Sequence, residues 1–172
     1  MPLEALFASA CLIAFVGLML VAAASDIATM TIPDWVSIAT VLLFPVAAAL
    51  AGLSPLQIGL HLGVGAAIFL LGFLLFSFGV LGGGDVKVIA AVSVWTGLAA
   101  LSTFAFAMTL AGGALAGGLL LARKAARPAD NRPAFLNRLL DPAGGIPYAV
   151  AIAVGVGASL PHLPVTRALF AQ

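Results

Sequence analysis

Residues 86–122 read VKVIAAVSVWTGLAALSTFAFAMTLAGGALAGGLLLA, an apolar run of 37 residues in which Lys87 is the only charged side chain. A single α-helix of that length would measure ~55 Å at ~1.5 Å per residue, whereas the hydrocarbon core of a bilayer is ~30 Å thick. The run must therefore break. Thr96-Gly97 and Ser102-Thr103 bracket the expected turn, which predicts helices near 86–100 and 102–122.

The composition of the whole chain is that of an integral membrane protein. Of its 172 residues, 63% are hydrophobic and 8% are charged, and the mean hydropathy is +1.24. Soluble domains are about half apolar and about a quarter charged. Further apolar runs at 5–25, 35–52, 56–80 and 146–163 predict an all-α, polytopic fold: a single domain over residues 1–172 with about six transmembrane helices.

Charge and cysteine content exclude several classes of function. A net charge of +1 gives no basic field for nucleic acid. One cysteine, Cys11, can form neither an intramolecular disulfide nor a cysteine-based zinc site. His61 and His162 lie far apart, without the spacing of a metalloprotease motif. We expect no metal and no cofactor.

Basic residues predict the orientation in the membrane, because cytoplasmic loops carry an excess of lysine and arginine. The segment 123–145 contains Arg123, Lys124, Arg127, Arg132 and Arg138. With six spans, the connections at 26–34 and 81–87 lie on the same, cytoplasmic side as that segment. The apolar residues within 135–140 suit either a short helix in the membrane interface or a solvated loop. Two glycine pairs, Gly59/Gly63 and Gly113/Gly117, are weak signals of close helix packing.

The connections 26–34 and 81–87 contain three acids, Asp26, Asp34 and Asp85. A structural role explains Asp34 better than it explains Asp26. Asp34 follows Pro33 and opens the second span, where a carboxylate can cap free backbone N–H groups. Asp26 ends the first span, where the helix dipole disfavours an anion, so no capping role explains it. A local turn through Ser25 or Thr29 remains an alternative for Asp26.

The third acid, Asp85, follows the run Gly82-Gly83-Gly84 and precedes Lys87. An N-cap role is available to Asp85, but a cap needs no glycine run. Glycines permit positive φ and leave the main chain bare, so that another extended peptide can lie against it. We expect Lys87 to extend toward lipid headgroups.

Asp26 and Asp85 on one membrane face favour aspartyl proteolysis. Two carboxylates held close together share a proton; the ionised one takes a proton from water and the protonated one polarises the scissile carbonyl. The alternative is a small transporter or assembly subunit in which the two acids bind a cation or relay protons.

Three motifs resemble those of the type IV prepilin peptidases. Asp26, with Ile32-Pro33-Asp34, is similar to that family's D-x6-P-[ND] motif, and Gly82-Gly83-Gly84-Asp85-Val86-Lys87 to its GxGD-x-K motif. The stretch GGIPYAVAI at 144–152 resembles the PY-x-x-A-[IL] opening of the family's last helix. Presenilin-like enzymes share GxGD, but this chain has no Tyr-Asp pair and no Pro-Ala-Leu tripeptide.

The resemblance implies catalytic roles for Asp26 and Asp85, an active-site loop of Gly82, Gly83, Gly84 and Lys87, and a secondary role for Asp34. It implies a multi-pass enzyme among the lipids of the bacterial inner membrane, and prepilin and pseudopilin substrates whose basic leader is cut at the cytoplasmic face. The chain lacks the four zinc-binding cysteines of the larger bifunctional enzymes, which puts N-methylation in doubt. It is more similar to the compact peptidases of tight-adherence (Flp) pilus systems. The sequence leaves the oligomeric state open.

Overall fold

The computed structural model describes residues 3–126 and 131–170, which form helices and loops without a strand. Arg127, counted above among the basic residues, lies outside the described residues. In chain order the elements are α1 (Leu3–Thr29), α2 (Asp34–Leu50), α3 (Pro55–Ser77), α4 (Gly83–Ala125), α5 (Ala134–Leu140), α6 (Ala149–Ser159), the 3-10 turn η1 (Leu160–His162) and α7 (Pro164–Phe170).

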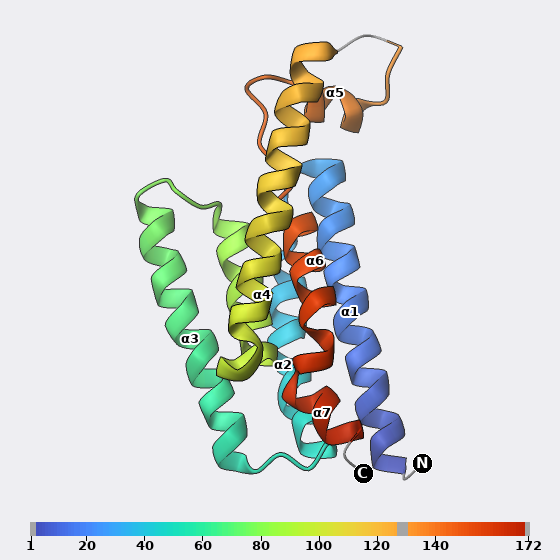
Figure 1. Cartoon of the computed structure of the whole chain (residues 1–172), viewed down its shortest axis with the longest axis vertical. Helices are drawn as coiled ribbons and strands as arrows, with labels where there is room; N and C mark the ends of the chain where they lie inside the picture. The colour runs from blue at the N-terminus through green and yellow to red at the C-terminus, as the bar shows by residue number, and fades with distance from the viewer. Residues whose placement is uncertain (1–2, 127–130, 171–172) are drawn as a thin grey trace.

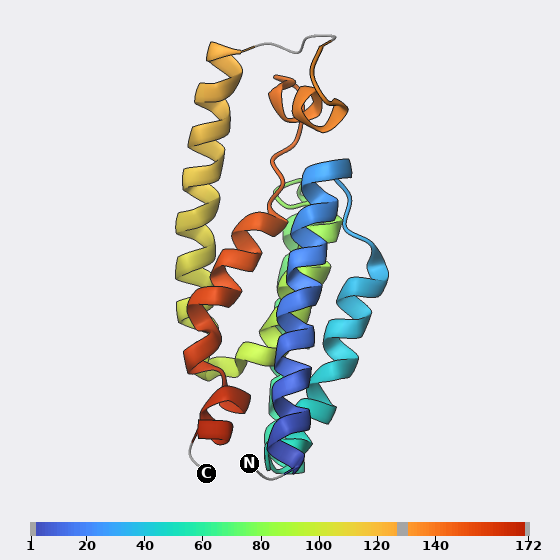
Figure 2. The same ribbon diagram turned by 90° about the vertical axis from the view of Figure 1, so that its right-hand side faces the viewer.

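The long helices run along the bundle, and α4 folds back on itself (Figures 1 and 2). The helices long and apolar enough to cross a membrane are α1, α3, α4 and the unit from α6 to α7, while α2 is a shorter apolar helix of 17 residues. The 43 residues of α4 double back at Gly97 and so supply two passes. Both termini lie at one end of the bundle. The prediction of an all-α polytopic membrane protein is confirmed.

The turn inside α4 is fixed by glycine. Gly97 has φ 52° and ψ −163°, a backbone region that in practice only glycine occupies. A Cβ at this position would also lie 2.4 Å from Cε1 of His61 on α3. The break falls within the predicted interval, although the first arm of α4 ends at residue 97 rather than at 100.

Contacts with three other helices hold this turn. A helix break removes hydrogen-bond partners from the preceding carbonyls, and the carbonyl of Val94 instead accepts a bond of 2.7 Å from Nδ1 of His61. The indole of Trp95 donates to the carbonyl of Thr40 on α2 at 2.9 Å. Its ring stacks on Phe15 of α1, with centroids 4.2 Å apart. The break is therefore part of the buried core.

Glycines also bring α3 against the first arm of α4. A Cβ at Gly65 would lie 2.3 Å from a methyl of Val94, and one at Gly72 would lie 2.8 Å from a methyl of Val86. The predicted glycine pairs make no such contact, because nothing lies within 4 Å of a Cβ built at Gly59, Gly63, Gly113 or Gly117. That expectation was wrong, and close packing falls on other glycines.

Candidate active site

Asp26 lies in the last turn of α1 and is almost fully buried, with 6% of its surface exposed. Its Oδ2 accepts a hydrogen bond of 3.0 Å from the backbone N–H of Ala149, the first residue of α6. The N-terminus of a helix carries unpaired N–H groups and a partial positive charge. The start of α6 thus compensates for the unfavourable position of this acid at the end of α1.

The turn after Asp26 is formed by other side chains. Met30 takes a positive φ of 56°, and its N–H donates to the carbonyl of Asp26 at 2.8 Å. The hydroxyl of Ser25 donates to the carbonyl of Thr31, and that of Thr29 to the carbonyl of Ser25, each at 2.8 Å. Hydroxyls therefore stabilise this turn, and the Asp26 carboxylate is left for the contact with α6.

Asp85 is the third residue of α4 and is half-buried. The N-cap position belongs to Gly82, which makes no side-chain cap bond. A Cβ on Gly82 would lie 2.8 Å from Oδ2 of Asp85, so the glycine leaves room for the carboxylate.

The glycines before Asp85 do not use left-handed backbone. Among the described residues, the glycines with positive φ are Gly52, Gly79 and Gly97. The run 82–84 therefore does not use the positive φ that glycine permits. The expected exposure of the main chain agrees with the structure. Gly83 and Gly84 are only partly covered, by Phe76 and Ile32 respectively.

One pocket of about 290 Å³ is lined by both Asp26 and Asp85. Its remaining walls are the connection 30–32, the glycine run 82–84, and residues Gly145 and Ile146. Burial raises the pKa of Tyr148, and so does the charge of Asp85 when that carboxyl is ionised; Tyr148 directly precedes the N–H donor to Asp26. Segments distant in the sequence therefore meet around two acids.

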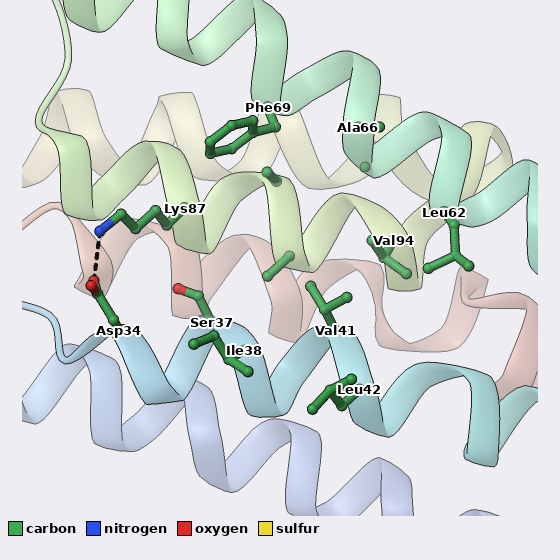
Figure 3. Close-up of a pocket in the computed structure, with 13 residues that line it drawn as sticks. Asp34, Ser37, Ile38, Val41, Leu42, Leu62, Ala66, Phe69, Lys87 and Val94 are labelled. Carbon is green, nitrogen blue, oxygen red and sulfur yellow. Dashed lines mark hydrogen bonds and ion pairs between the residues drawn. The ribbon is translucent and has the colours of Figure 1, made fainter.

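Asp34 and Lys87 form an ion pair of 2.7 Å between Lys87 Nζ and Asp34 Oδ1 (Figure 3). Asp34 is the first residue of α2, but the N-cap is Pro33 and no side chain caps the helix. The capping account of Asp34 was wrong, although its carboxylate does lie in the first turn, where the dipole favours it. Lys87 was expected to reach the headgroups, and instead it joins the start of α4 to the start of α2.

Two arginines, which in the sequence indicate only the orientation, donate hydrogen bonds to backbone carbonyls at the end of the bundle that contains the pocket. Arg123 donates through Nε to the carbonyl of Leu139 at 2.8 Å and through Nη2 to that of Gly145 at 2.7 Å. Arg138, on α5, donates to the carbonyl of Ala28 near the end of α1. The formation of α5 also decides the earlier alternative for 135–140 in favour of a helix. Arginine spacing alone gives no signal of these contacts.

Among the described residues, no group of three or more His, Cys, Asp and Glu side chains is placed to hold a metal ion.

The fold and this pocket define a helical membrane protein with two acids at one end of the bundle. The family model of the type IV leader peptidases matches residues 13–117, more than half of the chain. The chain belongs to this family and is a leader peptidase with prepilin-type substrates. The match includes Asp26, Asp34 and Asp85, and it ends before Tyr148. Comparison with curated proteins and with solved structures gives no match.

Proposed function

We propose that this protein is an aspartyl endopeptidase of the bacterial inner membrane that removes the basic leader from Flp-type prepilins and pseudopilins at the cytoplasmic face. Asp26 and Asp85 form the catalytic pair. The observation that carries the proposal is the single pocket lined by both acids, each of which lies within the segment matched by the leader peptidase family.

The surroundings of the two acids support different roles. The backbone N–H of Ala149 and the positive end of α6 stabilise a negative charge on Asp26. Asp26 is then the ionised member that takes a proton from the attacking water. Asp85 is the protonated member, and it donates to the oxygen of the scissile carbonyl as the water oxygen bonds to the carbonyl carbon.

Collapse of the resulting tetrahedral gem-diol completes the reaction. The C–N bond breaks, and the leaving nitrogen takes the proton that Asp26 holds. A hydroxyl of the gem-diol returns a proton to Asp85 as the new carboxyl group forms. Both acids end in their starting states, and no metal or cofactor takes part.

The cytoplasmic orientation is supported by where the basic residues lie. Arg123 and Arg138 contact the Gly145 and Ala28 carbonyls at the end of the bundle that contains the two acids. Lysine and arginine concentrate in cytoplasmic loops. The single cysteine cannot supply the four zinc ligands of the larger bifunctional enzymes. This supports the compact type of peptidase, and with it a Flp-type substrate.

The test is cleavage of a purified Flp-type prepilin by the wild-type protein, Asp26→Asn and Asp85→Asn, in the same detergent. We expect both variants to lose cleavage while keeping the wild-type helical content and melting behaviour. Asp34→Asn should keep a kcat close to that of the wild type, because Asp34 lines a different pocket from the two acids. A metal chelator should leave the rate unchanged. Cleavage that survives in Asp26→Asn or Asp85→Asn would remove that residue from the pair.

A further inference from the structure

An apolar groove of about 560 Å³ lies between α2, α3 and the first arm of α4 (Figure 3). One wall comes from Val41 and its neighbours on α2, and the other from Ala66 and Phe69 on α3. The floor is made of small side chains on α4, Ala90 and Ala91. The groove is thus a second site, on different surfaces from the pocket that holds the acids.

The groove exists because α3 leans on α4 rather than on α2. Gly65 and Gly72 let α3 pack closely against Val94 and Val86 of α4, and a Cβ at either position would lie less than 3 Å from a valine methyl. The alanines of α4 then leave space between α2 and α3 that a Leu or Phe would fill. Glycine and alanine at these places therefore keep the groove open.

One end of the groove is polar and adjoins the candidate active site. The ion pair of Asp34 and Lys87 lies there. Lys87 follows Asp85 by two positions, or about 200° around a helix with ~3.6 residues per turn. The pocket and the groove therefore flank the same turn of α4. The start of α2 and the connection before it border both, with Ile32 of the connection in the pocket and Asp34 of α2 in the groove.

We propose that this groove receives the first turns of the hydrophobic helix that follows the leader in the substrate. The inference rests on the proposed function, which places the scissile bond in the pocket at Asp26 and Asp85. The substrate beyond that bond must run from this end of the bundle into the membrane. The groove is apolar and begins beside the same turn of α4, so it supplies the path.

The size of the groove determines how the helix is bound. A helix of ~10 Å diameter and ~5.4 Å pitch occupies roughly 420 Å³ per turn. A groove of about 560 Å³ cannot enclose a transmembrane helix, so it takes side chains from one face, spaced i, i+3, i+4 and i+7. The opposite face of the substrate stays in lipid. A few extended residues, each covering ~3.3 Å, join this helix to the scissile bond.

The ion pair of Asp34 and Lys87 offers hydrogen-bonding groups for the backbone at the start of such a helix. The first N–H groups of a helix are unpaired, and a carboxylate beside them is stabilised by the dipole. The Asp34 side chain is 66% exposed and bonds Lys87 through Oδ1, which leaves Oδ2 to accept these N–H groups. Lys87 has two further donors for backbone carbonyls where the substrate chain is extended.

Disulfide cross-linking tests the placement. In a Cys11→Ala, Asp85→Asn background, Ala66→Cys places a thiol in the groove. Ala67→Cys places one on the same helix, at an exposed position that does not line the groove. Each is oxidised with a prepilin that has one cysteine in the first turns of its hydrophobic helix. We expect a cross-link at position 66 that exceeds the one at position 67 by at least tenfold.

Kinetics with two substrates provide the second measurement. Ala66→Trp fills the groove, and Ala67→Trp is its matched control. We expect Ala66→Trp to raise KM for full-length prepilin at least tenfold. The same variant should cut a soluble peptide of leader and junction at the wild-type rate, which also shows that it has folded. Ala67→Trp should cut both substrates normally.

The outcomes separate this inference from the proposed function. If the wild type cleaves prepilin but positions 66 and 67 cross-link equally, or Ala66→Trp cleaves full-length prepilin normally, the groove proposal is overturned and the groove is filled by lipid. If position 66 cross-links but the wild type cleaves nothing, the groove proposal stands and the peptidase proposal fails.

Discussion

Replacing Gly97 with alanine tests the account of how α4 is divided and how its first arm, which carries Asp85, is fixed. Gly97 has φ 52° and ψ −163°. Its Cβ would meet three atoms of the His61 ring at 2.4–2.9 Å. That ring cannot simply move aside, because Nδ1 bonds the Val94 carbonyl and the ring stacks on Phe44.

Two contributions set the expected loss of stability. A non-glycine residue in this backbone region costs about 1–3 kcal/mol. Displacing His61 removes a hydrogen bond worth about 0.5–1.5 kcal/mol. We expect Gly97→Ala to lower the free energy of unfolding by about 2–4 kcal/mol, a large fraction of the ~5–15 kcal/mol that holds a typical domain together.

The assay is equilibrium unfolding in mixed micelles for Gly97→Ala, His61→Ala and the double variant. In a protein that lacks the His61 ring, Gly97→Ala loses only the free energy that the unfavourable backbone conformation costs. The double variant should therefore be more stable than the sum of the single losses predicts, by about 1 kcal/mol. Gly113→Ala is the control in the same helix, because nothing lies within 4 Å of its Cβ position. It should be neutral or stabilising by up to about 1 kcal/mol.

If Gly97→Ala lowers the free energy of unfolding by less than about 1 kcal/mol, the backbone at position 97 does not require glycine. Strict additivity in the cycle would show instead that the His61 ring does not restrict this site.

The remaining predictions concern the walls of the pocket. Gly82→Ala should reduce kcat severalfold or more without unfolding the protein, because its Cβ would lie 2.8 Å from the Asp85 carboxylate while the φ of −72° suits alanine. Gly84→Ala meets only ordinary contacts at 3.6 Å and should stay near wild type; equal losses in steady-state cleavage would contradict this account. Arg123→Met removes one hydrogen bond to Gly145 of the pocket wall and one to Leu139 of α5, each worth about 1 kcal/mol, and should lower kcat/KM by roughly tenfold or more. Lys124→Met removes a neighbouring charge and should have little effect, and a matched loss in this variant would show that Arg123 acts only through charge.

The sequence alone was sufficient to predict the helical membrane fold and to place Asp26 and Asp85 at the same end of the bundle. The length of the run at 86–122, compared with the thickness of a bilayer, requires a break, and the break is found at Gly97. Counting passes from the basic segment then places Asp26 and Asp85 at one end, and both line one pocket. Hydropathy and segment length are properties of single segments, so they can be evaluated without knowing any partner.

Only the tertiary structure decided which side chains meet. Helix rotation and lateral packing join Asp34 to Lys87, bring the N–H of Ala149 to Asp26, and select Gly65 and Gly72 for close contact. Because lipid tails are as apolar as the side chains, the hydrophobic effect does not favour one helix pairing over another within a bilayer. Shape complementarity and a few polar contacts choose between pairings, and these depend on both partners at once.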